Sequence, residues 1–230
     1  MTASQNLPEA VIFDWDDTLA ENWLSIHGAL NASLAAMGHG LWSMEKARTN
    51  IRLSMRESFP KMFGDRWEEA ADIFYTHIRT NHLETLKSLD YAQELLDRLS
   101  AAKITLGIVS NKTGDILRAE CTHLGWNDYF TNIIGAGDAI KDKPAPDPLH
   151  LCLENTGINP GLKTWYVGDA PSDLECAQNA GVTAVLIRDS AITPDYDEFP
   201  PHHHFKNLNK MAEFLFYRNN GFQTGQSGVL

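Results

Sequence analysis

The sequence AVIFDWDDTL, residues 10–19, carries the strongest structural signal in this chain. Its first four residues are apolar and include two β-branched side chains, which is typical of a short strand buried on both faces. Asp14 follows this run directly, and Asp16 comes two residues later. The stretch therefore predicts a buried strand that ends in a pair of carboxylates.

Further apolar runs alternate with stretches in which apolar residues recur at helical spacing. This alternation indicates an α/β fold, with a Rossmann-like parallel sheet that has helices on both faces. In open sheets of this kind, ligands bind beyond the carboxyl ends of the strands, so polar residues at those ends are candidates for a site. The strands are expected at residues 10–13, 104–109, 132–134, 164–167 and 183–187.

The separation of the first two strands indicates an inserted segment. Asp14 and Ser110 are separated by far more chain than the roughly 30 residues of one β-helix-β crossover. Apolar residues recur at helical spacing within the surplus. We therefore expect a small all-helical cap domain at residues 21–85, inserted into a catalytic core made of residues 1–20 and 86–220.

The chain after the last expected strand is rich in Pro and His and is expected to be irregular. A return helix before the second strand is expected at 92–102, a terminal helix at 208–216, and a flexible polar tail at 221–230. The run from His202 to His204 is not expected to bind a metal, because adjacent residues of an extended segment point to opposite sides.

Composition and charge argue against several classes of function. The formal net charge of −11 argues against non-specific binding to nucleic acid or to an anionic membrane. No apolar run approaches the roughly 18 residues that a membrane span needs. The first Lys or Arg is Lys46, so a leader peptide is not indicated and a cytoplasmic protein is expected. The cysteines are widely spaced and are expected to be small buried residues: Cys121, Cys152 and Cys176.

Two motifs follow the first two expected strands. Asp14 and Asp16 are a pair of neighbouring carboxylates, which suits phosphoryl transfer because one can attack phosphorus and the other can donate a proton. Ser110 and Asn111 come where a strand leads into a helix, and the N–H and hydroxyl groups there suit an anion. Both motifs also have a plainer interpretation, because these residue types commonly cap helices.

Two more motifs lie further along the chain. Lys143 stands beside Pro144 in a loop that prolines would stiffen, although a solvated loop charge is the alternative. Asp169 and Asp173 follow another expected strand, where helix capping is the alternative. All four motifs occur in order, each at the carboxyl end of an expected strand or in the adjoining loop, and this conjunction favours one shared site.

With these four motifs, the sequence resembles the haloacid-dehalogenase-like hydrolase superfamily over nearly the whole chain. The helical insertion, the Ser-Asn-Lys sequence and the Lys-Pro-x-Pro sequence are most similar to the phosphoglycolate-phosphatase-like branch. The resemblance implies a Mg²⁺-dependent phosphatase that acts on a small phosphorylated metabolite, with phosphoglycolate as a candidate. Asp14 would be the nucleophile that forms an aspartyl-phosphate, and Asp16 the general acid and base. Asp17 departs from the family, in which this position is often Gly.

The resemblance also implies a metal site and a phosphate site. Mg²⁺ would be held by the carboxylates of Asp14 and Asp169 and by the backbone carbonyl of Asp16. Asp173 would orient Lys143 or a metal-bound water, and Thr18 would stand in a supporting position. The phosphate would be bound by side chains of the second and third motifs: Ser110, Asn111 and Lys143.

The cap is expected to close over the site and to set substrate specificity. Arg48, Arg52 and Arg56 recur every four residues and are expected on one helix face. Arg52 and Arg56 are candidates for binding a carboxylate or a second phosphate, and a solvated face of an amphipathic helix is the alternative. Trp15 is a candidate for the pocket wall, with buried packing as its alternative.

Related reactions remain as alternatives. Asp16 favours phosphate chemistry over dehalogenation, because an alkyl halide leaving group needs no proton. A sugar phosphomutase keeps the same core residues and stays open as the enzymatic alternative. A catalytically silent binding module would have no chemical need for the complete set of motif residues.

Overall fold

The computed structural model describes residues 7–51, 53–189 and 196–216. A six-stranded sheet forms its centre, with the strand order β5-β4-β1-β6-β7-β8 and parallel pairing throughout. The strands are β1 (Ala10–Phe13), β4 (Thr105–Thr113), β5 (Asn132–Ala136), β6 (Thr164–Gly168), β7 (Thr183–Ile187) and β8 (His203–Phe205). The α/β fold with a parallel sheet is therefore confirmed.

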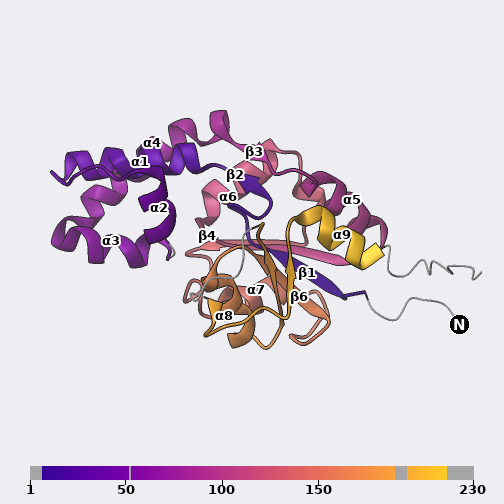
Figure 1. Cartoon of the computed structure of the whole chain (residues 1–230). Coiled ribbons are helices and arrows are strands. Elements are labelled where there is room, and N and C mark those ends of the chain that lie inside the picture. The colour runs from indigo at the N-terminus through magenta and orange to yellow at the C-terminus, as the bar shows by residue number, and fades with distance from the viewer. Residues whose placement is uncertain (1–6, 52, 190–195, 217–230) are drawn as a thin grey trace, which may run out of the picture.

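Helices cover both faces of this sheet (Figure 1). One face packs against α5 (Ala92–Ala101), α6 (Gly114–His123) and α9 (Leu208–Phe216), with Val11 and Phe13 of β1 in the shared hydrophobic core. The other face packs against α7 (Asp147–Leu153) and α8 (Pro171–Asn179), with Ile12 of β1 in that core. Because both faces are covered, the central strands are apolar on both sides, as their sequences indicate.

Four further helices lie between β1 and β4: α1 (Trp23–Ala36), α2 (Met44–Asn50), α3 (Met55–Phe63) and α4 (Trp67–Thr85), with the short η1 (Gly64–Arg66) before α4. We call this group the helical unit. Its helices share a hydrophobic cluster, in which Leu30 and Phe74 are buried and to which α6 contributes Ile116. At its two ends, β2 (Ala20–Glu21) and β3 (Lys87–Ser88) pair in antiparallel fashion, so the chain enters and leaves the helical unit side by side (Figure 1).

The expected shared face of Arg48, Arg52 and Arg56 is wrong. Helix α2 ends at Asn50, Ile51 has extended backbone angles, and α3 begins only after Ser54. Ser is a favoured residue immediately before a helix, so Ser54 marks a new start within the apolar periodicity. Arg48 and Arg56 therefore lie on different helices, and Arg52 lies outside the described residues.

The segment with the histidine run is not wholly irregular, because His203 to Phe205 form the edge strand β8 beside β7. The ring of His203 packs between Trp165 and Phe214, which explains why a polar sequence forms a strand here. A short 3-10 helix, η2 (Asn127–Tyr129), precedes β5. The expected tail at 221–230 lies outside the described residues. Among the described residues, no helix is long and apolar enough to span a membrane.

Candidate active site

Three neighbouring strands bring the first, second and fourth motifs together. Strands β4, β1 and β6 are adjacent in the sheet and parallel, so their carboxyl ends lie at one edge. Ser110 lies in the carboxyl half of β4, whereas Asp14 and Asp169 directly follow β1 and β6. This edge is where open parallel sheets bind ligands, and the structure places the predicted residues there.

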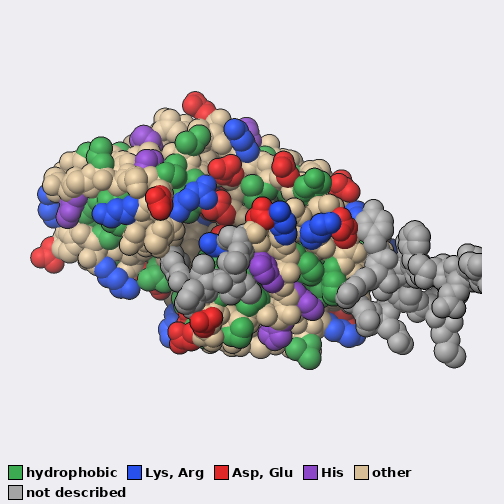
Figure 2. Space-filling model, in the orientation of Figure 1, with side chains coloured by type: hydrophobic (Ala, Val, Ile, Leu, Met, Phe, Trp, Pro, Cys, Tyr) green, Lys and Arg blue, Asp and Glu red, His purple; other side chains and the backbone are tan. Residues whose placement is uncertain are grey.

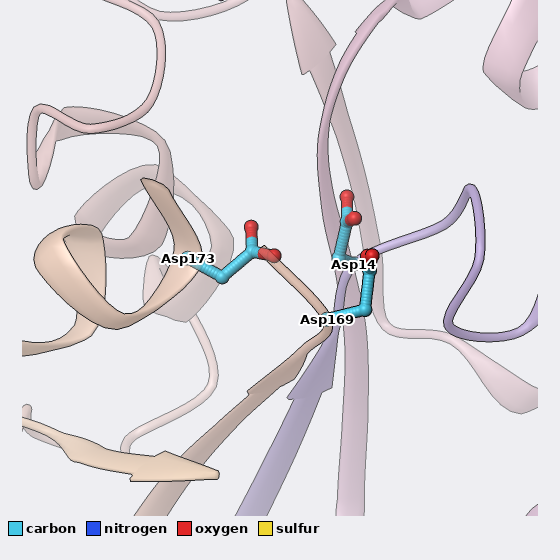
Figure 3. A group of neighbouring side chains, drawn as sticks. All are labelled: Asp14, Asp169 and Asp173. Atoms are coloured by element: carbon cyan, nitrogen blue, oxygen red, sulfur yellow. The ribbon is translucent and has the colours of Figure 1, made fainter. Parts of the chain in front are cut away.

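Three carboxylates form a cluster at this edge. Oxygen atoms of Asp14, Asp169 and Asp173 all lie within 4.8 Å of one another. Figure 3 shows Asp173 reaching from α8 toward the other two side chains. Gly168 permits this approach, because a Cβ atom at that position would collide with the Asp173 carboxylate. Asp173 also accepts a hydrogen bond from the Ala170 backbone N–H at 3.0 Å, so it caps α8 as well as serving the cluster.

The electrostatics of the cluster favour a cation. Burial raises the pKa of Asp14 to about 7, although the charge of Lys143 acts in the opposite direction. Burial also raises the pKa of Asp169 well above its usual value, and the charges of Asp173 and Asp14 raise it further. A set of oxygen ligands with this much negative charge fits a hard divalent cation such as Mg²⁺.

Lys143 bridges two members of the cluster. Its Nζ atom lies 2.7 Å from Asp14 and 2.7 Å from Asp173, and the side chain is buried. Burial lowers the pKa of Lys143, but the two carboxylates outweigh it, so the net pKa is raised. Asn111 holds the lysine loop through two hydrogen bonds: its amide donates to the Lys143 carbonyl, and its oxygen accepts from the Lys143 N–H. The lysine is therefore fixed and charged.

Asp16 lies apart from this cluster and contacts a different lysine. Its Oδ1 atom accepts from Nζ of Lys112 at 2.8 Å. Burial raises the pKa of Asp16 to about 6, against the lowering effect of Lys112. Lys112 also lies 2.6 Å from Glu120, and both of these side chains are buried. The two motif carboxylates Asp14 and Asp16 thus have separate cationic partners.

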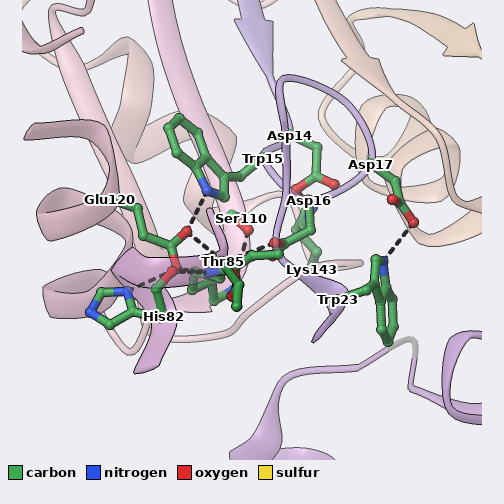
Figure 4. A network of polar contacts seen from close by, with 12 residues as sticks. Asp14, Trp15, Asp16, Asp17, Trp23, His82, Thr85, Ser110, Glu120 and Lys143 are labelled. Atoms are coloured by element: carbon green, nitrogen blue, oxygen red, sulfur yellow. Dashed lines mark hydrogen bonds and ion pairs between the residues drawn. The ribbon is translucent and has the colours of Figure 1, made fainter. Parts of the chain in front are cut away.

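Glu120 on α6 joins the site to both connections of the helical unit (Figure 4). It is fully buried and accepts from Nε1 of Trp15 at 2.6 Å and from the amide of Asn22 at 2.7 Å. Nδ1 of His82, near the end of α4, lies 2.9 Å away. Sequence reasoning assigned no role to Glu120 or Lys112. For Glu120, the signal in the sequence was an acidic residue on the apolar stripe of α6, which contains Ile116, Leu117 and Cys121.

Other predicted residues support the site from within the core. Thr18 is fully buried, and its hydroxyl donates to Asp169 at 3.5 Å. Trp15 is fully buried and packs edge-on against Trp126, which agrees with the packing interpretation.

Asp17 has a φ of 60°, in the left-handed region that Gly adopts freely and that Asp tolerates better than most residues. This explains how Asp17 occupies a position where Gly is common.

A cavity of about 380 Å³ lies between the helical unit and the sheet. Figure 2 shows the surface hollowed where these two parts meet. Trp15 and Arg56 are not among the residues that line the cavity. The predicted residues that do line it come from all four motifs: Asp14, Asp16, Ser110, Asn111, Lys143, Asp169 and Asp173.

The described arginines of α2 and α3 bind carboxylates of the loops that carry the first and third motifs. Arg48 lies 2.7 Å from Asp17, and its guanidinium lies over the ring of Trp23. Arg56 makes a two-point contact with Asp142, in which Nη2 donates to Oδ1 at 2.6 Å. These contacts link the helical unit to the loops that carry the motifs. Arg52 is not described, so its predicted role stays a prediction.

Comparisons with known proteins agree with this geometry. The chain matches the model of the family described as haloacid dehalogenase-like hydrolase over residues 11–187. It is 28% identical over 188 residues to the phosphoglycolate phosphatase of Xylella fastidiosa, covering 80% of this chain and 82% of the relative. It is 27% identical over 214 residues to the pyrophosphatase PpaX of Bacillus velezensis, covering 90% of this chain and 94% of the relative.

A solved structure supports membership of the same family. The HAD-superfamily hydrolase from Ehrlichia chaffeensis superposes with a TM-score of 0.64 at 30% sequence identity, covering 95% of this chain and 100% of that chain. The family match includes β1 with its carboxylates, the helical unit, and the strands that deliver the other motifs. The chain therefore belongs to the haloacid dehalogenase-like hydrolase family.

Proposed function

We propose that the protein is a Mg²⁺-dependent phosphatase that hydrolyses a small phosphomonoester through an aspartyl-phosphate on Asp14. The observation that carries this proposal is the convergence of Asp14, Asp16, Lys143 and Asp169 on one cavity. Relatives named phosphoglycolate phosphatase and pyrophosphatase support phosphate chemistry.

In the proposed first step, a carboxylate oxygen of Asp14 attacks phosphorus and the bond from phosphorus to the ester oxygen breaks. Asp16 gives its proton to that oxygen, so the leaving group departs as a neutral alcohol. In the second step, a water oxygen attacks phosphorus while Asp16 takes a proton from the water. Inorganic phosphate leaves and the Asp14 carboxylate is restored. A pKa of about 6 suits Asp16 to exchange protons near neutral pH.

Lys143 is the buried cation that would offset the negative charge of the phosphoryl group. Lys143 lies 2.7 Å from the Asp14 carboxylate, so its charge reaches the oxygens of a phosphoryl group bound there. Asp173 keeps this lysine in place from the other side. The carboxylates of Asp14 and Asp169, with the backbone carbonyl of Asp16, would hold Mg²⁺, which when bound supplies further positive charge at the phosphate oxygens.

Residues 21–85 are proposed as a cap domain and residues 1–20 with 86–220 as the catalytic core. The hydrophobic cluster of the helical unit supports this division, because Ile116 of α6 is its one buried member from the proposed core among the described residues. The pairing of β2 with β3 also supports it, because both connections then lie side by side and leave one hinge region. A cap over the cavity would exclude bulk water during phosphoryl transfer.

The test is inorganic phosphate release from a panel of small phosphomonoesters, including 2-phosphoglycolate and several sugar phosphates. The full chain is assayed with Mg²⁺ and again after chelation. We expect one group of esters to be hydrolysed, with release abolished by the chelator. Interconversion of sugar phosphate isomers without phosphate release would contradict the proposal and favour a phosphomutase.

A further inference from the structure

The wall that the helical unit contributes to the cavity is strongly apolar. Among the described residues of the helical unit, all the lining side chains except Arg48 and Thr49 are hydrophobic or aromatic. They come from α1, from the α2–α3 connection, from the start of α3 and from α4, and they line the same cavity as the motif carboxylates. They include Ile26, Ile51, Leu53, Met55, Phe74 and Ile78.

The described cations that line the cavity or lie near it have partners within the protein, and Arg188 on the core side donates to the Tyr196 hydroxyl at 2.8 Å. Arg48 is the one charged side chain of the helical unit among the described lining residues, and it lies 2.7 Å from Asp17. Lys112 lies between two carboxylates on the opposite, core side of the cavity. Arg56 is held by Asp142 and does not line the cavity. A substrate carboxylate placed against the apolar wall would therefore lose water with little compensation from the described residues.

We infer, resting on the proposed phosphatase function, that the natural substrate is a phosphomonoester of an apolar alcohol with a branched alkyl or aryl group. The phosphate would lie on the motif residues and the hydrocarbon against the helical unit. A cavity of about 380 Å³ lies near the lower end of the roughly 300–1,000 Å³ found for small-molecule pockets. Glycolate, the alcohol of phosphoglycolate, would instead place a second anion at this wall.

Leu53 is the position that tests the wall with least risk to folding. Its side chain is half-buried and lines the cavity, but it is not part of the hydrophobic cluster of the helical unit. A matched control is Leu41, which belongs to the same part of the chain, is 66% exposed and does not line the cavity. Leu53→Ser and Leu41→Ser therefore make the same chemical change, the first at a position that lines the cavity and the second at a position that does not.

The experiment measures kcat/KM for phosphate release by the full chain with Mg²⁺ on ethyl, isobutyl and benzyl phosphate and on 2-phosphoglycolate. Isobutyl phosphate has the same connectivity of non-hydrogen atoms as 2-phosphoglycolate, with two methyl groups in place of the carboxylate oxygens. We expect kcat/KM to rise from ethyl to isobutyl to benzyl phosphate, and to be about tenfold higher for isobutyl phosphate than for 2-phosphoglycolate.

The Leu53→Ser and Leu41→Ser variants test whether the apolar wall causes the preference for the larger esters. Leu53→Ser should lower kcat/KM for the isobutyl and benzyl esters about tenfold, with a change below about threefold for the ethyl ester. Leu41→Ser should leave all four values unchanged. Equal losses on every ester in Leu53→Ser would overturn the apolar subsite.

Two further outcomes separate this inference from the function on which it rests. If 2-phosphoglycolate is hydrolysed as well as or better than isobutyl phosphate, the inference is overturned and the phosphatase proposal stands. If no ester is hydrolysed above the background of Asp14→Asn, the phosphatase proposal is overturned and the inference with it.

Discussion

Nζ of Lys112 lies 2.8 Å from an oxygen of Asp16, and the same atom lies 2.6 Å from Glu120. The carboxylate proposed to move the proton is thus held by a buried lysine that a second buried carboxylate holds in turn. Glu120 also contacts Asn22, which directly precedes α1, and His82, which lies in the last turn of α4. The position of Asp16 is therefore tied to the two connections on which the helical unit would move.

Lys112→Met should lower kcat about 10²-fold and change KM by less than about threefold, because proton transfer suffers while the phosphate site stays intact. Steady-state kinetics on the best phosphomonoester measures both constants. Lys163→Met is the matched control, since Lys163 is an exposed lysine paired with Glu9 on the surface. A kcat of Lys112→Met within threefold of the wild type would contradict the positioning role.

Glu120→Gln should lower the free energy of unfolding by roughly 3 kcal/mol, because the change removes one charge of a buried ion pair. Urea denaturation measures this value. The matched control is Glu213→Gln, since Glu213 pairs with Lys210 on the surface and should contribute less than about 1 kcal/mol. Equal effects of the two variants would show that the buried network adds no stability.

Much of the sheet could be predicted because its central strands are continuous apolar runs. The runs at 10–13, 164–167 and 183–187 match β1, β6 and β7 within one residue at each end. Strand β8 could not be predicted from its sequence, since two of its three residues are His and its position depends on pairing with β7 and on ring packing with Trp165. The break between α2 and α3 could not be predicted either, because apolar residues continue at helical spacing across it.

The site residues could be predicted where polar, reactive side chains lie at or just beyond the carboxyl ends of strands. Asp14 and Asp169 directly follow β1 and β6, and Ser110 lies in the carboxyl half of β4. Glu120 could not be found in this way, because it lies in the middle of a helix and its partners come from segments far apart in the sequence. A single sequence does not show which of many acidic helix residues the fold will bury, and only the packing of α6 against the helical unit decides it.

Mg²⁺ should stabilise the folded protein, because Asp14, Asp169 and Asp173 repel one another without a cation. At a concentration of 100 times its Kd, the ion should add about 2.7 kcal/mol to the free energy of unfolding. Thermal denaturation with and without Mg²⁺ measures the effect. Asp169→Asn should abolish it and the exposed control Asp65→Asn should keep it; the same Mg²⁺ response in both variants would contradict the metal assignment.

The three cysteines should be inert in the folded protein. Burial raises the pKa of the Cys121 and Cys152 thiols to about 12 and also raises that of Cys176. Since the thiolate is the reactive form, a thiol reagent at pH 8 should modify all three slowly in buffer and rapidly in guanidinium. Ser88→Cys, at an exposed position, should add one fast-reacting thiol to the native protein. Rapid reaction of the native wild type would contradict the burial of these residues.

The central claim is that Asp14 attacks phosphorus, and the most direct measurement is the kcat of Asp14→Asn on the best phosphomonoester with Mg²⁺. The amide retains the shape of the side chain but is not a nucleophile, so kcat should fall by more than about 10³-fold while the variant still unfolds cooperatively. Retention of most of the wild-type kcat by a folded Asp14→Asn variant would contradict the account.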